Sequence, residues 1–356
     1  MPKKGCLNKG KTSILIVIIA GIGDLILASK SIRAIRNGFP DADIHLLTNK
    51  DAVEIGNNYK YVDKVWSFHI RELRHPIFFV LDILKLIRNL RKFDFILAIN
   101  LYRVCSWIGS MKMALLFSLI KAQIKVGHDN FGFGVLLDKK VPKGTFQDQH
   151  FVDAMMDIAL LGGGKPDPEG IEVFWDQKVA KKWAHLFSDH GNTPLKIAIN
   201  PGANERHKRW DPKKYALVAD QLLETYEAEI ILLGGPGEEN IARQIQDNMR
   251  NHSLSLAGKL SLNDLACIIS RLNLLLTNDS GPMHIAAAVR TPIVAIFGPE
   301  TPIHTRPYTS DDLFRIVQKG LDCRPCIKNN CERPVCLDLI QPDEVIKGCH
   351  DLLKNR

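Results

Sequence analysis

One stretch of the chain, residues 273–308, constrains the fold more than any other. Its sequence, NLLLTNDSGPMHIAAAVRTPIVAIFGPETPIHTRPY, predicts a short buried strand, a tight turn, an Ala-rich helix and a second buried strand. Ser280 suits the helix cap, Gly281 the turn and Pro282 the first helical turn. The N-terminus of such a helix, with its free N–H groups and positive dipole end, favours a phosphate group. Taken alone, an Asp-Ser-Gly turn would favour an ordinary structural turn.

A second turn rich in Gly and Pro, residues 298–302, follows the next predicted strand. The loops after parallel strands open at the same edge of the sheet, where α/β proteins bind their ligands. The two turns together therefore predict a ligand site.

The length and charge of the chain narrow the classes of protein to consider. With 356 residues the chain is too long for a single hydrophobic core, which predicts two domains. Its net charge of +8 suits an anionic partner such as a nucleotide or an anionic membrane surface. A nucleic acid is disfavoured, because no run of Lys and Arg is interleaved with aromatic residues.

The N-terminal apolar run, residues 14–20, follows several lysines, as the apolar region of a signal peptide would. No small-residue cleavage site follows it, and we interpret it as a first buried strand. No stretch reaches the roughly 18 uninterrupted apolar residues of a membrane span. We therefore expect a cytoplasmic protein.

Predicted strands recur about every 25–30 residues with helical patterns between them, which indicates an α/β fold of two doubly wound domains. Residues 162–168 and 176–193 form the best boundary region, beyond which the pattern restarts, and residues 138–149 suggest an irregular loop. We therefore expect the following division: an N-terminal domain at 1–175, a linker region at 176–194, a C-terminal domain at 195–338 and a terminal helix at 339–356.

Asp24 follows the first predicted strand and the turn Gly21-Ile22-Gly23. It could be a first-turn helix cap, which would contribute roughly 0.5–1 kcal/mol to stability, or a base at the edge of the sheet.

The apolar segment 107–120 also has two interpretations. A core helix is favoured over a surface helix that docks on an anionic bilayer.

Four of the eight cysteines are close together: Cys323, Cys326, Cys331 and Cys336. They could form a structural zinc or iron–sulfur site. A Cys-rich surface loop is favoured, because the group contains no His and lacks the paired spacing of strong zinc sites.

Five segments in this order resemble the ADP-heptose:lipopolysaccharide heptosyltransferase family (glycosyltransferase family 9). They are GIGDLIL (21–27), INPGANERHKRW (199–210), LLGGPGEE (232–239), TNDSGPMHIAAAVRTPIVAIFGP (277–299) and CRPCIKNNCERPVCL (323–337). The resemblance spans nearly the whole chain and is weakest at residues 69–174. It implies the glycosyltransferase B fold, in which two Rossmann-like domains face each other across a cleft. It also implies inverting transfer of heptose from ADP-L-glycero-D-manno-heptose to a lipid-linked inner-core oligosaccharide, with no required cofactor and no catalytic metal.

The resemblance also implies roles for individual residues. Asp24 would be the general base, and Lys208 would neutralise the diphosphate of the donor. Ser280 and Gly281 would hold phosphate, and Asp279 would face the donor sugar. The remaining residues of the implied site are the ribose-binding Glu238 or Glu239, Gly23 in the first turn, Asn204 before the lysine and His284 as support for the phosphate turn.

Other functions were weighed against this one. A glycosyltransferase with another sugar nucleotide keeps every motif, because the motifs mainly contact the nucleotide. A sugar-nucleotide epimerase would need more acid–base groups than Asp24 and Asp279, and a pure binding protein would not need both Asp24 and Lys208. A dinucleotide dehydrogenase is disfavoured because GIGDLIL lacks the third Gly of its motif. A lipid-linked acceptor would place the enzyme at the inner face of the cytoplasmic membrane, with the basic and apolar span 71–125 as the docking segment.

Overall fold

The computed structural model describes residues 12–68, 76–142, 144–147, 149–187, 194–321, 323, 326, 331 and 335–354, with only the backbone at 76–82. The chain forms two compact units, Met1–Glu169 (unit 1) and Gly170–Arg356 (unit 2). The boundary thus falls earlier than residue 175. Part of the expected linker belongs to unit 2, because α7 (Gln177–Lys182) packs on α10 (Leu262–Ile269).

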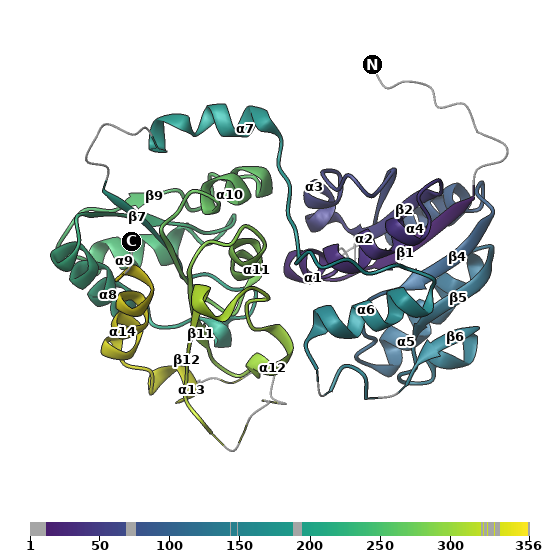
Figure 1. The fold of residues 1–356 in the computed structure, drawn as a ribbon. Coiled ribbons are helices and arrows are strands. Elements are labelled where there is room, and N and C mark those ends of the chain that lie inside the picture. The colour runs from purple at the N-terminus through teal and green to yellow at the C-terminus, as the bar shows by residue number, and fades with distance from the viewer. Residues whose placement is uncertain are drawn as a thin grey trace. The chain divides into compact units, whose positions relative to one another are not determined.

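Unit 1 contains a six-stranded parallel sheet (Figure 1). In spatial order its strands are β3 (Lys64–Phe68), β2 (Asp43–Asn49), β1 (Ser13–Ile18), β4 (Phe95–Asn100), β5 (Ala122–His128) and β6 (Lys139–Val141). The expected irregular loop at 138–149 contains β6, so that prediction was wrong for its first part. Three residues paired at the edge of a sheet are too few to leave a periodic pattern in the sequence.

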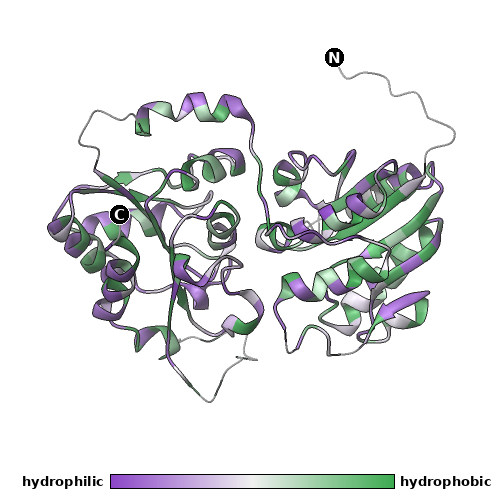
Figure 2. Cartoon of the chain, viewed as in Figure 1, coloured by the Kyte–Doolittle hydropathy of each residue, from purple (hydrophilic) through white to green (hydrophobic). Residues whose placement is uncertain are grey.

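The helices of unit 1 cover both faces of this sheet. They are α1 (Ile22–Leu27), α2 (Ser29–Gly38), α3 (Val53–Gly56), α4 (Pro76–Leu90), α5 (Trp107–Leu119) and α6 (Phe151–Leu161), with short 3-10 turns η1 (Lys50–Ala52) and η2 (Phe133–Leu136). Leu15 and Val17 of β1 pack in one core with α4 and α5, while α2 packs against α6. Burial on both faces explains why β1 is apolar after Ser13, and Figure 2 shows hydrophobic colour along the central strands.

Unit 2 repeats the same architecture. Its parallel strands are, in spatial order, β12 (Phe314–Gln318), β11 (Ile293–Phe297), β10 (Leu274–Asn278), β7 (Leu195–Asn200), β8 (Ala228–Leu232) and β9 (Leu254–Ser255). Its other helices are α8 (Pro212–Thr225), α9 (Glu239–Asn248), α11 (Gly281–Ala288), α12 (Pro302–Thr305), α13 (Val335–Asp338) and α14 (Pro342–Leu353), with 3-10 turns η3 (Ala184–Phe187), η4 (Arg206–Lys208) and η5 (Asp311–Leu313). The helices α8 and α14 share a core with β7, and α10 packs against α11.

Both sheets have the strand order 3-2-1-4-5-6 when each unit is numbered by itself. In this order the chain reverses its direction across the sheet between the first and fourth strands, and ligands of doubly wound proteins bind outside the carboxyl ends of those strands. The candidate edges are therefore those of β1 and β4 in unit 1, and of β7 and β10 in unit 2.

The helix α5 differs from its favoured prediction. The sequence favours a core helix, yet only Ser110 and Phe117 are buried, and Trp107, Ile108, Met111 and Leu115 are exposed. The apolar composition of α5 therefore reflects burial on one side of the helix only, where side chains such as Leu116 and Phe117 pack in the core. Within the part of the chain that the structure describes, no helix is long and apolar enough to cross a bilayer.

Candidate active site

Two loops meet at the carboxyl edge of β7 and β10, and the buried side chain of Asn278 holds them together. Its Nδ2 donates to the carbonyl of Pro201 at 2.8 Å. Its Oδ1 accepts the backbone N–H of Trp210 at 3.2 Å and the hydroxyl of Tyr215 at 2.9 Å. One amide thus fixes the loop after β7, from its first residue to the start of α8.

Asn200, at the end of β7, makes the second connection. Its Nδ2 lies 3.3 Å from Ser280 Oγ, 3.3 Å from the carbonyl of Gly202 and 3.4 Å from Thr277 Oγ1. Ser280 precedes α11 but makes no side-chain cap to that helix. Its hydroxyl is instead oriented by Asn200 and Thr277, which holds the turn before Gly281 in place.

Lys208 lies in the loop after β7 among three carboxylates. Its Nζ is 3.2 Å from Asp279 Oδ2, 3.5 Å from Glu300 Oε1 and 3.9 Å from Glu205 Oε2. The three partners come from the loops after β10, β11 and β7 respectively. The two Gly/Pro turns predicted from the sequence therefore converge on one ammonium group.

Burial and charge act in opposite directions on this cluster. Burial lowers the pKa of Lys208, but the carboxylates, led by Asp279 and then Glu300, outweigh it and hold that pKa above its usual value. Burial also raises the pKa of Asp279, against the opposing effect of Lys208. Lys208 is consequently charged at neutral pH, in a position that is only 19% exposed. A partly buried, fixed cation at a sheet edge is suited to an anionic ligand.

The structure distinguishes the two candidate glutamates. Glu238 Oε2 accepts the backbone N–H of Gly235 at 2.8 Å, and Glu238 Oε1 lies 3.6 Å from Arg209 Nη2. A Cβ placed on Gly202 would lie 2.2 Å from the Glu238 carboxylate, which shows how closely that carboxylate approaches the loop after β7. Glu239 instead lies against Gly258, in the turn after β9. Of the two glutamates, Glu238 is thus the one that approaches the loop after β7, the loop that also carries Lys208.

Two other predicted residues differ in their surroundings. Asn204 is exposed in the loop after β7. His284 is buried in α11, one turn beyond Gly281. The supporting role implied for His284 stays a prediction.

The matching edge of unit 1 carries Asp24. Its Oδ2 accepts the backbone N–H of Gly21 at 3.0 Å, so the residue does cap α1, next to the half-exposed Gly23. Burial, and then the charge of Asp24, raises the pKa of Tyr102 in the loop after β4. Arg103, from the same loop, opposes that rise. The carboxylate therefore lies beside the β1–β4 switch point as well as capping a helix.

Several residues that contact or influence the candidate site residues were not predicted from the sequence. The sequence assigns no roles to Asn200, Glu300, Tyr102 and Arg103, although each lies at the end of a predicted strand or within three residues after it. Position at a strand end was the signal that could have found them. Which of them touch one another depends on the order of strands in the sheet, which the motifs did not give.

Comparison with known proteins decides the family. The sequence model described as glycosyltransferase family 9 (heptosyltransferase) matches residues 83–336, well over half of the chain. The chain belongs to glycosyltransferase family 9.

Two characterised relatives of this family 9 enzyme illustrate the range of similarity. Lipooligosaccharide heptosyltransferase 2 of Campylobacter jejuni is 31% identical over 166 residues, covering 45% of this chain and 51% of that protein. The match therefore spans about half the length of the Campylobacter relative. Lipopolysaccharide heptosyltransferase 3 of Escherichia coli is 25% identical over 306 residues, covering 81% of this chain and 84% of that protein.

A solved structure shares the fold of the family 9 enzyme. The Escherichia coli ADP-heptose lps heptosyltransferase II superposes with a TM-score of 0.74 and 22% identity, covering 97% of this chain and 99% of that one. Two six-stranded Rossmann-like sheets thus form the glycosyltransferase B fold expected from the resemblance.

The cysteine group contacts the second Gly/Pro turn through one described backbone hydrogen bond, in which Cys326 N–H donates to the carbonyl of Pro299 at 3.1 Å. Cys336 is buried in α13, while most residues between Cys323 and Cys336 lie outside the described part of the chain. Among the residues that are described, no group of three or more His, Cys, Asp or Glu side chains is arranged to hold a metal ion.

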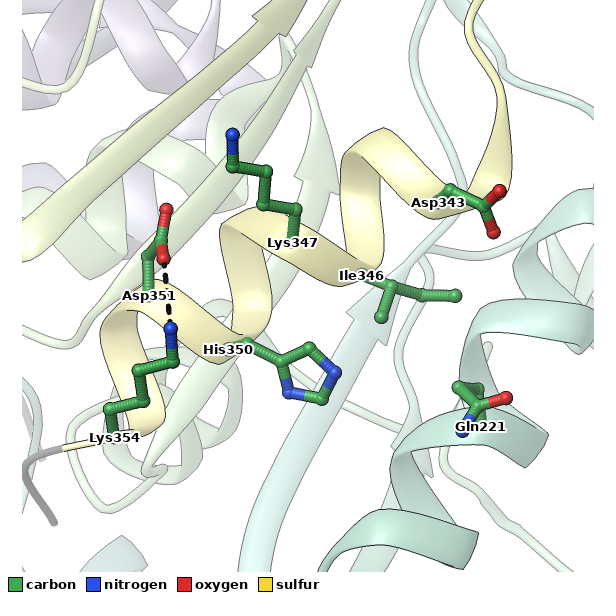
Figure 3. A pocket seen from close by; sticks show the side chains of 7 residues that line it. All are labelled: Gln221, Asp343, Ile346, Lys347, His350, Asp351 and Lys354. Atoms are coloured by element: carbon green, nitrogen blue, oxygen red, sulfur yellow. Dashed lines mark ion pairs between the residues drawn. The ribbon is translucent and has the colours of Figure 1, made fainter.

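A groove of about 400 Å³ lies elsewhere in unit 2 (Figure 3). It is lined by Gln221 of α8 and by residues that follow one face of α14: Asp343, Ile346, Lys347, His350, Asp351 and Lys354. Gln221 and Ile346 lie across it from each other in Figure 3. Its lining is mostly charged and includes none of the residues around Lys208.

Proposed function

We propose that this family 9 glycosyltransferase moves a heptose from ADP-L-glycero-D-manno-heptose to the inner-core oligosaccharide of lipopolysaccharide. The observation that carries the proposal is the partly buried ammonium of Lys208 at the β7–β10 switch point, beside the turn that begins α11. The names of the Escherichia coli relatives, which specify lipopolysaccharide and ADP-heptose, support this choice of donor and acceptor.

In this proposal unit 2 binds the donor. Lys208 and the backbone N–H of Gly281 hold the diphosphate, because both present positive charge at the edge of the sheet. Glu238 accepts a hydrogen bond from a ribose hydroxyl, and Asp279 faces the sugar. Lys208 must exchange part of its carboxylate contacts for phosphate oxygens when the donor enters.

Asp24 of unit 1 acts as the general base. An acceptor hydroxyl attacks the anomeric carbon of the heptose, and the bond from that carbon to the diphosphate oxygen breaks on the opposite face. Asp24 takes the hydroxyl proton, and ADP leaves with the electron pair of the broken bond. A single displacement inverts the anomeric configuration. The reaction balances with donor and acceptor alone, so the proposal requires no cofactor.

The proposed acceptor also sets the place of action. Lipopolysaccharide core is built on a lipid anchor, so we expect a cytoplasmic enzyme that works peripherally at the inner face of the cytoplasmic membrane. In the docking span proposed from the sequence, residues 71–75 lie outside the described part of the chain, and the remainder includes α5.

Calorimetric titration of the purified protein with ADP, UDP and GDP tests the donor. We expect ADP to bind most tightly and ADP-heptose to support transfer to heptose-deficient lipopolysaccharide, with inversion seen by NMR of the product. Preference for UDP or GDP would move the enzyme to another sugar nucleotide, and absence of binding by all three would contradict the donor site around Lys208.

A further inference from the structure

The outer face of α5 exposes large apolar side chains in a continuous stripe. Trp107, Ile108, Met111 and Leu115 are 66%, 67%, 71% and 58% exposed. Their spacing places them on one side of the helix, because residues four apart are neighbours on a helix surface. The opposite side is anchored in unit 1, where Phe117 packs against Phe133 with ring centroids 5.3 Å apart.

The short turn η2 extends this stripe. Val135 and Leu136 of η2 are 84% and 38% exposed, and η2 packs directly against α5. Trp107 also contacts Phe131, just before η2, at a centroid distance of 5.9 Å. We call this surface of α5 and η2 the apolar face. A soluble monomer rarely exposes so many neighbouring apolar side chains without a partner for them.

The apolar face begins at the edge of the sheet where Asp24 lies. The loop that leads into α5 follows β4, and η2 follows β5 (Figure 1). Asp24 follows β1 in the same parallel sheet, so all three lie beyond the carboxyl ends of their strands. A ligand that covers the apolar face is thus brought to the side of unit 1 that carries the proposed base.

The charges around the apolar face are positive. Residues 107–119 contain one charged side chain, the exposed Lys112, and the exposed Lys121 follows the end of α5. The nearby acids are engaged: Asp129 pairs with Lys140 at 3.2 Å, and Asp138 accepts the backbone N–H of Lys125 at 2.7 Å. A second copy of the chain is disfavoured as the occupant, because a twofold contact would bring two copies of the same lysine-bearing face together.

We propose that the apolar face rests in the headgroup region of an anionic bilayer. Trp107, Ile108 and Met111 enter the boundary between headgroups and acyl chains, and Lys112 meets lipid phosphate. The proposal deepens the proposed function and rests on it for one point, the lipid anchor of the acceptor. The same contact that holds the enzyme at the membrane then holds the Asp24 edge near lipid-linked acceptors.

Sedimentation of the full chain with vesicles tests this. We expect binding to vesicles of phosphatidylethanolamine and phosphatidylglycerol, and little binding to pure phosphatidylcholine. The double variant Ile108→Ser/Met111→Ser should reduce the partition coefficient by about tenfold or more, because it removes inserted apolar side chains. Lys112→Gln should reduce it about fivefold at low salt and less at high salt.

The matched control is Leu160→Ser/Leu217→Ser, which alters two exposed apolar side chains on α6 and α8. It should bind vesicles like the wild type. The proposal would be overturned if both double variants lost vesicle binding equally, or if the wild type did not bind anionic vesicles at low salt. It would also be overturned if size-exclusion chromatography showed an oligomer that binds no lipid and that dissociates only when the α5 residues are replaced. ADP titration of each variant separates this result from the proposed function, since ADP binding should be unchanged throughout.

Discussion

The two units have the same strand order and differ at the edges where that order places a ligand. In unit 2 the edge is polar and internally paired, with Lys208 among three carboxylates and Asn278 joining the loops. In unit 1 the edge carries Asp24 beside Tyr102, and next to it a helix with an exposed apolar face. A shared topology therefore fixes where each unit can bind, while loop residues determine what it binds.

In the proposed function the two edges have different tasks. A fixed cation among carboxylates suits a charged group that binds and leaves again, as a nucleotide diphosphate does. A carboxylate in a helix cap near an apolar surface suits proton removal from a lipid-linked hydroxyl. Variants at one edge should thus alter one of these tasks and leave the other intact.

The largest effect is expected at the edge of unit 1. Asp24→Asn should lower kcat by about 10²- to 10⁴-fold, because the amide cannot take a proton from the acceptor. The amide oxygen can still accept the Gly21 N–H, so folding and ADP binding should not change. Steady-state transfer assays and ADP titration measure the two quantities. Asp41→Asn, at an exposed position, serves as the control, and near-normal turnover by Asp24→Asn would refute its role as base.

An intermediate effect is expected in unit 2. Lys208→Ala should weaken ADP binding by about 10- to 150-fold, because charge-assisted hydrogen bonds contribute about 1.5–3 kcal/mol and the remaining carboxylates repel phosphate. Calorimetry gives the dissociation constant. Lys213→Ala removes an exposed lysine from α8 nearby and should bind ADP normally. The division of tasks fails if the two lysine variants bind ADP equally well.

The smallest effect tests the position of Glu238. Gly202→Ala should displace its carboxylate, which lies 2.2 Å from the new Cβ, and weaken donor binding by about 2- to 10-fold, the equivalent of one hydrogen bond. Gly235→Ala is the matched control, since its Cβ would meet Glu238 Oε2 at an ordinary 3.7 Å. Both variants should stay folded, because the end of a flexible side chain can move. Unchanged binding in Gly202→Ala would indicate that Glu238 does not contact the donor.

Much of the fold could be predicted from the sequence. Buried strands such as β1 and β7 appear as continuous apolar runs, and the Gly turns after them mark their carboxyl ends. The predicted ends of helices and of the two units were less accurate, because they depend on only a few residues. The segment after the first turn forms two helices, α1 and α2, which meet at Ala28. The unit boundary at residues 169–170 lies between the two segments, 162–168 and 176–193, from which it was expected.

The candidate site was predicted as separate residues and not as an arrangement. Lys208 and Asp279 were recognised from motifs 71 positions apart, and only the pairing of β7 with β10 brings them together. The choice between Glu238 and Glu239 depended on backbone direction in one turn. The exposure of α5 could not be predicted either, because an apolar helix looks the same in sequence whether the protein or a partner covers it.

The carboxylates around Lys208 have a consequence for the entropy of binding. A free lysine side chain loses up to about 2 kcal/mol of conformational entropy when it is immobilised. The side chain of Lys208 is already restricted by three ion pairs, with Asp279, Glu300 and Glu205. Much of this entropy is therefore lost when the protein folds and not when a ligand binds. In the proposed function the same carboxylates compete with the donor phosphate for Lys208 and limit its affinity. The proposed donor would thus bind to a lysine that is already ordered. The competing carboxylates would keep the binding weak enough for ADP to be released.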